Sequence, residues 1–388
     1  MKKWVLLFLV TLAIAACGWV YFDAHRPYRA FSGNLILTIE PGKSAPEIAQ
    51  SLVERGVLRH SLPFLVLHAL GRRRHRTLKA GEYLFDGPAS PLDVYEKIAQ
   101  GRIYYHLVVI PEGSDRFDIA RILQQKLGMD PEQFLQVTRQ TAPIRDLDPS
   151  APTLEGYLFP DSYRFAHGAT AAVVVETMVG QFRKVLGADF AQDFGPGFPS
   201  LHDVLTLASL IEKETPDPAE RSLIAGVFER RLAAGMTLDC DPTVAYAARL
   251  DSGLPGPAFA PITESQLQSP SPYNTYRQPG LPPGPICSPG EVSLRAALHP
   301  AAGKALYFVS NNHGGHVFAS TLAEHERNVA RYRREIASSQ PIIANGASTD
   351  SKPEPAVAKK TPRHRERRKR VRRRSRRARH KEPKGAHS

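Results

Sequence analysis

An uncharged, apolar run of about 19 residues extends from Trp4 to Phe22, and Lys2 and Lys3 stand immediately before it. As a helix rising about 1.5 Å per residue, this run nearly spans the hydrocarbon core of a bilayer. Lysines at the start of such a helix favour the cytoplasmic side, which places the chain after Asp23 on the outer side of the membrane. The run therefore predicts a single-pass anchor over residues 1–22 and a short polar linker over residues 23–32.

Two other segments can begin in this way. A cleaved signal peptide has a shorter apolar core and a cleavage site of small residues. The stretch from Ile14 to Cys17 also resembles a lipoprotein cleavage box. The apolar run nevertheless continues past Cys17 through Trp19 to Phe22, which favours a spanning helix over both alternatives.

The strongly basic charge of the chain belongs to its C-terminal tail. From Lys352 to Ser388 there are 17 lysines and arginines against three glutamates, a balance of +14 in a chain of net charge +13. The preceding residues are therefore almost neutral. Because the tail has few apolar side chains to bury, we expect residues 339–388 to be disordered. Outside the membrane it would contact anionic polymers of the envelope rather than nucleic acid, unless it is a solvated tail without a ligand.

Residues 33–101 have the pattern of a small α+β module. A strand is expected at Leu35–Ile39 and a helix after Ser44, where Glu47 completes a capping box. A second helix over 61–70, a strand over 81–85 and a helix over 91–101 follow. The stretch "LTIEPGKSAPEIAQSL" resembles a LysM domain, a small glycan-binding unit, although a generic spacer domain has the same pattern.

Residues 102–338 predict a second, mixed α/β domain, so the chain as a whole belongs to the α+β class. Strands are expected there over 104–110 and 306–310, the latter in a hairpin with 315–318, and helices are expected over 117–127, 133–141, 171–186, 219–234, 244–250, 294–298 and 322–336. The stretch "LEGYLFPDSYRF" puts four aromatic residues on an irregular path, either as core or as the lining of a cleft. Residues 255–289 form a long loop rich in proline and glycine, and loops of this length usually carry function.

A short apolar helix over residues 202–215, "HDVLTLASLIEKET", ends in two carboxylates. At about 100° per residue, Glu212 and Glu214 lie roughly 200° apart and flank the apolar face on opposite sides. Glu214 has the bulkier apolar neighbours, Leu207 and Leu210, so its carboxyl loses more water and has the higher pKa. Glu214 is therefore the better candidate for an acid, although a solvated helix end is the ordinary interpretation of such a pattern.

Three other positions have alternative interpretations. Cys240 and Cys287 can form a disulfide if the body lies in an oxidising compartment, or they can be two buried free thiols. Asp241 is either a helix N-cap or a second catalytic acid. The histidines of the C-terminal part do not have the spacing of a metal site, and no metal is expected there.

Several motifs occur in an order that resembles the endolytic murein transglycosylase family, also called YceG-like. They are "LEGYLFPDSY", "LASLIEKET", "LDCDPTVAYA", "SPYNTYRQPGLPPGPICSPG", "LYFVSNNHGGHVFA" and "LAEHERNV". The resemblance covers residues 33–338, and cysteines at positions 240 and 287 depart from the family pattern. It implies a lytic transglycosylase of the inner (plasma) membrane, with its body on the periplasmic side and no cofactor. The substrate would be the glycan strands of peptidoglycan, and peptidoglycan synthases would be possible partners.

The resemblance implies a role for one residue, and the chemistry of strand cleavage suggests roles for others. Glu214, the second carboxylate of "EKET", falls on the catalytic acid. Tyr273, Asn274 and Thr275 would bind the substrate, with stabilisation of a turn as the alternative. Glu212 and Asp241 are also candidates for binding substrate or for acting as a second acid. A muramidase that uses water and a non-catalytic peptidoglycan-binding scaffold are the competing functions.

Overall fold

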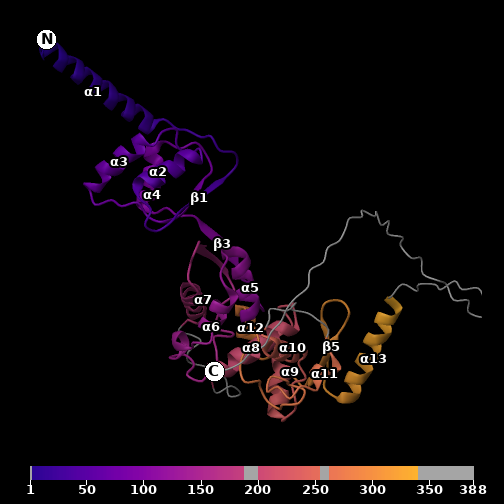
Figure 1. Cartoon of the computed structure of the whole chain (residues 1–388). Helices are drawn as coiled ribbons and strands as arrows, with labels where there is room; N and C mark the ends of the chain where they lie inside the picture. The colour runs from indigo at the N-terminus through magenta and orange to yellow at the C-terminus, as the bar shows by residue number, and fades with distance from the viewer. Residues whose placement is uncertain (1, 188–199, 254–261, 340–388) are drawn as a thin grey trace, which may run out of the picture. The chain divides into compact units, whose positions relative to one another are not determined.

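The computed structural model describes residues 2–187, 200–253 and 262–339, and all of them belong to one compact unit that ends at Ser339. The described ranges contain thirteen α-helices and three antiparallel two-stranded sheets (Figure 1). The predicted α+β class is therefore confirmed. Residues 340–388, which make up the basic tail, lie outside the described residues.

The first helix, α1 (Lys2–His25), contains the whole apolar run (Figure 1). Trp4 is 76% exposed, and the apolar side chains that follow it are largely exposed as well. In the described part of the chain, α1 is the one helix long and apolar enough to cross a membrane. Such a surface is compatible with a membrane anchor, because a bilayer would cover it.

The small module has the predicted order of strand, helix, helix and strand. Strands β1 (Leu35–Ile39) and β2 (Gly81–Phe85) pair antiparallel with Leu37 opposite Tyr83. The expected capping box is present, since the Glu47 carboxylate accepts the backbone N–H of Ser44 at 2.8 Å. The module has its own hydrophobic cluster, separate from that of the following domain. Its helices are α2 (Ala45–Glu54), α3 (Leu62–Arg72) and α4 (Pro91–Gln100).

The second domain begins with an antiparallel pair of strands that the sequence did not reveal. Strand β3 (Tyr105–Val109) was expected, but β4 (Ser162–Ala166), which pairs with it, lies in the aromatic stretch that was predicted to be irregular. The two strands are separated by more than fifty residues, so no local turn signals the pairing. The four aromatic side chains of this stretch are all buried, and the core interpretation therefore holds for them: Tyr157, Phe159, Tyr163 and Phe165.

Helices make up most of this domain, and most of them start or end within a few residues of the predicted positions. The helix that carries Glu214 is α8 (Leu201–Glu214), capped at its start by the Ser200 hydroxyl. The others are α5 (Arg116–Leu127), α6 (Pro131–Val137), the short 3-10 helix Ala142–Ile144, α7 (Ala171–Leu186), α9 (Arg221–Ala233), α10 (Asp241–Ser252), α11 (Glu264–Leu267) and α12 (Glu291–Leu298).

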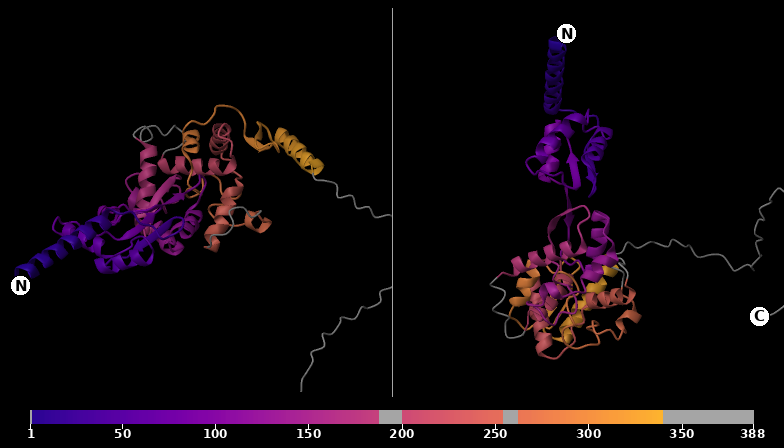
Figure 2. Two further views of the ribbon diagram at one scale, coloured as in Figure 1. Left: turned by 90° about the horizontal axis from the view of Figure 1, so that it is seen from above. Right: turned by 60° about the vertical axis from the view of Figure 1, so that its left-hand side comes forward.

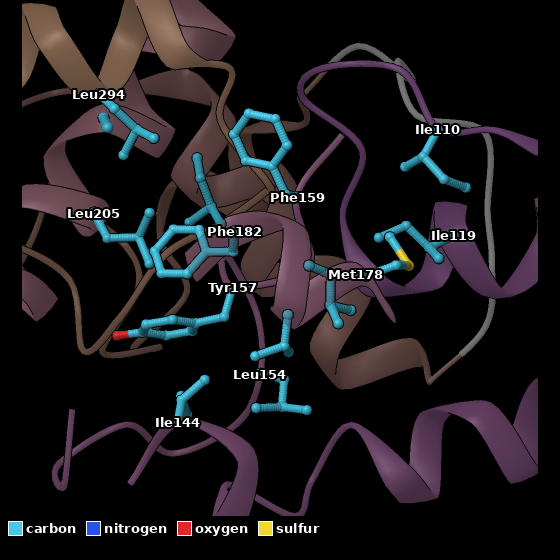
Figure 3. Packing of buried hydrophobic residues seen from close by; sticks show 14 of the residues in the cluster. Ile110, Ile119, Ile144, Leu154, Tyr157, Phe159, Met178, Phe182, Leu205 and Leu294 are labelled. Atoms are coloured by element: carbon cyan, nitrogen blue, oxygen red, sulfur yellow. The ribbon is translucent and has the colours of Figure 1, made fainter. Parts of the chain in front are cut away.

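The core of the domain packs around the inner face of α8. Figure 3 shows Leu205 of α8 pointing toward the rings of Tyr157 and Phe182. These two rings meet edge to face with their centroids 5.4 Å apart, a geometry that aromatic pairs prefer. The Tyr157 hydroxyl donates a hydrogen bond to Asp148, so its one polar atom is satisfied inside the core. The helix that bears Glu214 is thus held rigidly by its apolar face.

A hairpin and the last helix complete the described chain. Strands β5 (Tyr307–Ser310) and β6 (His316–Ala319) pair as predicted, and α13 (Leu322–Ser339) packs on them (Figure 2). The hairpin also contacts α9, where the rings of Phe308 and Phe228 meet edge to face. This contact fixes the position of His316 at the start of β6.

A buried polar network joins α5, α10 and the segment before β4. The Arg249 guanidinium lies 2.5 Å from the Asp115 carboxylate, and the Tyr246 hydroxyl donates to Glu155 at 2.9 Å. Burial, followed by the negative charge of Asp115, raises the pKa of Glu155 to about 8. The network therefore contains an acid that is largely protonated at neutral pH.

We expect this acid to make the protein less stable in alkaline solution. Because the folded-state pKa of Glu155 is raised, its stabilising contribution is fully present below the ordinary carboxyl range and is lost as the pH rises through about 8. Between pH 5 and pH 9 the wild type should lose roughly 2–4 kcal/mol more unfolding free energy than Glu155→Gln, which stays neutral. Urea unfolding followed at both pH values measures this difference. Equal losses in the two proteins would contradict it.

Candidate active site

Glu214 is the last residue of α8, and Thr215 ends the helix in an extended conformation. The residue is partly exposed, whereas the apolar side chains of the preceding turn are fully buried. Burial is the main cause that raises the pKa of the Glu214 carboxyl, and the negative charge of Asp241 raises it further. The raised pKa expected from its apolar neighbours is thus confirmed.

Two groups lower the pKa of Glu214. The Cys240 thiol donates a hydrogen bond to Glu214, and His316 contributes positive charge, so both favour the carboxylate form. The same contact, together with burial, keeps the Cys240 thiol protonated, because its pKa is raised well above the ordinary value. The carboxyl therefore has neighbours that stabilise each of its protonation states, which suits a group that gives up a proton and takes it back.

His316 is held in place by a second carboxylate. Its Nδ1 lies 2.7 Å from Glu220 Oε2, and its backbone N–H donates to Oε1 of the same residue at 2.7 Å. The Thr215 hydroxyl, next to Glu214, also donates to Glu220 at 3.2 Å. Burial alone would raise the pKa of Glu220, but the hydrogen bonds from His316 lower it overall. The β5–β6 hairpin is thereby joined to the end of α8.

Asp241 is the first residue of α10, and the N-cap position belongs to Cys240. The expectation that Asp241 is the N-cap is therefore wrong by one residue. Its carboxylate instead accepts a hydrogen bond from the Tyr276 hydroxyl at 2.5 Å. Tyr276 was not singled out in the sequence, although it lies in the long loop whose length suggested a function.

The other residues of this loop segment have local partners. The Asn274 amide donates to the carbonyls of Leu267 and Ser269 at 2.9 and 2.8 Å. The Thr275 hydroxyl accepts the backbone N–H of Cys240 at 3.0 Å. These bonds shape the loop and fix Cys240 beside Glu214. Asn274 and Thr275 thus have the turn-stabilising role that was the alternative to substrate binding. Tyr273 packs edge to face on Tyr246, and burial raises its pKa to about 12.

Glu212 lies in a different environment from Glu214. Its two oxygens accept hydrogen bonds from the Arg221 guanidinium at 2.9 and 3.2 Å, and the backbone N–H of Gly290 donates to it at 3.0 Å. Its side chain is only 5% exposed. These contacts fasten the end of α8 to α9 and to the start of α12. The geometry thus gives Glu212 a structural part in holding the helix that carries Glu214.

Cys240 and Cys287 do not form the disulfide that the sequence allowed, and both are free, buried thiols. Each thiol instead donates a hydrogen bond to a different partner. The Cys240 thiol donates to Glu214, and the Cys287 thiol donates to the carbonyl of Ser209 at 3.3 Å. Next to Cys287, the backbone N–H of Ile286 donates to the Ser209 hydroxyl at 3.0 Å. The long loop is therefore held along α8 by hydrogen bonds instead of a covalent bridge.

Comparison with known proteins identifies the relatives of this chain. The sequence model of the YceG-like family matches residues 37–331. The endolytic murein transglycosylase of Bacillus subtilis strain 168 is 30% identical over 312 residues, which cover 76% of this chain and 84% of the relative. The protein of the same name from Streptococcus pneumoniae strain D39 is 28% identical over 365 residues, 85% of this chain and 65% of the relative.

A solved structure gives the same result. The crystal structure of a YceG-like protein from Listeria monocytogenes aligns with 76% of this chain and 99% of its own, at 30% identity and a TM-score of 0.53. The family match spans both the small module and the domain that carries Glu214. The chain therefore belongs to the YceG-like family.

Proposed function

We propose that this protein is an endolytic murein transglycosylase that cleaves the MurNAc–GlcNAc glycan strands of peptidoglycan and so ends their elongation. Relatives from two bacteria bear this name. The observation that carries the proposal is the carboxyl of Glu214, which is partly withdrawn from water at the end of a rigid helix and has a raised pKa. Such a group can donate a proton near neutral pH.

The proposed reaction needs one carboxyl, because the substrate supplies the attacking hydroxyl. Glu214 donates its proton to the glycosidic oxygen while the bond from MurNAc C1 to that oxygen breaks. The C6 hydroxyl oxygen of the same sugar then bonds to C1, and its proton passes to the Glu214 carboxylate. The products are a 1,6-anhydro-MurNAc end and a new free GlcNAc end, and no water is consumed.

Because the neighbours of Glu214 shift its pKa in known directions, the mechanism predicts how variants of these neighbours change the pH dependence of strand cleavage. A proton donor works only in its protonated form, so activity is present below the raised pKa of Glu214 and is lost above it. Asp241→Asn removes a negative charge that raises this pKa, and the alkaline limit of activity should move to lower pH. Cys240→Ala removes a donor that lowers it, and the limit should move to higher pH. Rates of strand cleavage measured across the pH range test both directions.

Two features of the variants keep this test specific. Asn at position 241 retains the oxygen that accepts the Tyr276 hydroxyl, so the loop keeps its anchor. Cys240→Ser retains a donor toward Glu214 and serves as the control for Cys240→Ala. A shift of both variants in the same direction would show that the alkaline limit does not report Glu214.

We propose that five residues belong to the substrate site, some by contacting the sugar and others by positioning those that do: Tyr273, Asn274, Thr275, Glu212 and Asp241. Asn274 and Thr275 are fully buried and position the loop, and Glu212 positions α8. Tyr273 and Asp241 keep polar groups in less buried places. Positioning of this kind can supply a large part of a rate enhancement, because it fixes the reacting groups relative to one another.

A second candidate function rests on the nearness of Asp241 to Glu214. Glycosidases that use water need two carboxyl groups, one as acid and one as base or nucleophile. A muramidase using these two residues would release reducing MurNAc ends. A non-catalytic peptidoglycan-binding scaffold would release no ends at all.

One experiment separates these three functions. The full-length protein in detergent is incubated with intact peptidoglycan, and the new chain ends are identified by mass spectrometry. We expect anhydro-MurNAc ends from internal positions of the strands. Reducing ends would identify a muramidase, and unchanged strands would favour a scaffold.

The remaining assignments follow from the proposed activity. We propose that α1 anchors the chain in the inner membrane with its body on the periplasmic side, and that the small module is a LysM-like unit for glycan. Apolar residues of α3, among them Val66 and Leu70, line a groove with Val20 of α1, which supports placing α3 near the membrane surface. The basic tail would contact anionic envelope polymers, and peptidoglycan synthases would be partners.

A further inference from the structure

Three potential metal ligands meet where the small module joins the second domain. Glu82 lies in β2, His106 in β3, and His167 directly follows β4. His106 Nε2 is 2.6 Å from one carboxylate oxygen of Glu82, and His167 Nδ1 is 3.5 Å from the other. One ligand atom from each residue lies within 4.8 Å of the other two.

The two histidines project from the same face of the β3–β4 strand pair because of the register in which these strands pair. His106 pairs with Phe165 across the antiparallel strands. Residue 167 is two positions further along, so its side chain projects from the same face as that of its diagonal neighbour His106. The imidazole rings are 6.1 Å apart between centroids. The β3–β4 strand pair therefore presents two imidazoles to Glu82.

Contacts within the small module hold the Glu82 side chain close to the two imidazoles. Its side chain is only 10% exposed although it lies on a two-stranded sheet, and it is directly opposite Thr38, whose hydroxyl is 3.5 Å from it. Its backbone carbonyl accepts the N–H of Tyr104 at 2.7 Å, and the Tyr104 ring meets His106 edge to face. A buried carboxylate is costly without a positive partner. The surrounding contacts thus fix this charge at the junction.

We propose that these three residues bind a divalent transition metal ion, with Zn²⁺ as the reference ion. Two imidazole nitrogens and one carboxylate oxygen are a common zinc ligand set, and water can occupy the fourth position. Ligand atoms about 2.1 Å from a tetrahedral zinc ion are roughly 3.4 Å from one another. The His106–Glu82 pair must therefore open by less than 1 Å, roughly the amount by which side-chain rotation moves such atoms.

The chemistry of the ligands narrows the choice of ion. Ca²⁺ and Mg²⁺ prefer all-oxygen sites with six or more ligands, whereas imidazole suits Zn²⁺ and its neighbours in the transition series. His167 is 52% exposed and His106 is 25% exposed, so an ion can enter from solvent. A bound ion would join the small module to the second domain through ligands from both. This site lies outside the catalytic residues, and its existence does not depend on the proposed function.

Metal binding is tested on the full-length protein in detergent after treatment with a chelator. Titration with Zn²⁺ alone, followed by calorimetry, should show one high-affinity site per chain, and Zn²⁺ should raise the melting temperature. Co²⁺ in place of Zn²⁺ should give the visible absorption bands of a low-coordinate site with nitrogen ligands. The variants His167→Ala and Glu82→Gln should each weaken Zn²⁺ binding about 100-fold or more, since even indirect supporting contacts are worth 10–100-fold.

His60→Ala is the matched control, because His60 also pairs with a carboxylate, that of Asp23, at 3.1 Å. It should leave binding, the rise in melting temperature and the Co²⁺ bands unchanged. His167 is half exposed, so its replacement by alanine preserves the fold and keeps the test valid if Glu82→Gln does not fold. Absence of a stoichiometric site in the wild type, or binding that survives in His167→Ala, would overturn the proposal.

Discussion

A Glu214→Gln variant is expected to release anhydro-MurNAc ends about 10²–10⁴-fold more slowly than the wild type, because it loses the proton that general acid catalysis requires. Glutamine has nearly the shape of a protonated glutamic acid, so packing at the end of α8 should be preserved. The charge that burial and Asp241 disfavour is absent from the variant, so its stability should be equal or slightly higher. A loss of activity without a loss of stability is thus the expected signature.

Two further variants test whether the loss of activity comes from the missing proton of Glu214. Glu291→Gln changes a half-exposed carboxylate of α12 that is paired with Arg295, and it should retain full activity. Glu214→Asp keeps the acid but shortens the side chain by one methylene, so it should lose activity through misplacement of the proton donor. Strand cleavage by Glu214→Gln within a few-fold of the wild type would show that another group is the acid, and unchanged strands for every protein would favour the scaffold.

The sequence predicted the element that matters most because its signals are local. The apolar spacing along residues 202–215 and the bulky neighbours of Glu214 depend only on residues within two turns of one helix. The structure confirms that helix as α8 and gives Glu214 the raised pKa that was inferred. The capping box of α2 and the β5–β6 hairpin were likewise predictable, since short sequence patterns specify both.

The features that the sequence did not reveal depend on residues that are far apart in the chain. Tyr276 reaches Asp241 across 35 positions, and Glu220 reaches His316 across 96. Strand β4 does alternate, with Tyr163 and Phe165 buried between exposed neighbours, but five residues inside a longer aromatic stretch are a weak signal, and its partner β3 lies more than fifty residues earlier in the chain. For the two cysteines, oxidising surroundings allowed a bridge, but the three-dimensional positions of their hydrogen-bond partners decided against it.

Removal of the Arg221 guanidinium is expected to cause a large loss of stability. Arg221, the first residue of α9, is 5% exposed and binds both oxygens of the buried Glu212 carboxylate. Breaking a buried ion pair on one side costs about 3–5 kcal/mol, because the remaining charge has no compensation. Arg221→Met keeps the apolar stem, so the loss should report mainly the unpaired charge of Glu212, because the second carboxylate near Arg221, that of Glu112 at 3.7 Å, is half exposed. Urea unfolding of the purified full-length protein measures it.

The double variant Arg221→Met, Glu212→Gln shows whether the charge or the packing is responsible. If the unpaired carboxylate causes the loss, removing it as well should restore most of the stability, since a buried pair replaced on both sides is often neutral. Arg295→Met, in a pair that is half exposed, should cost no more than about 1 kcal/mol. If Arg221→Met were as mild as Arg295→Met, α8 would not depend on Glu212 for its anchor. The position of Glu214 would then have to come from the apolar face of the helix and from Cys240 alone.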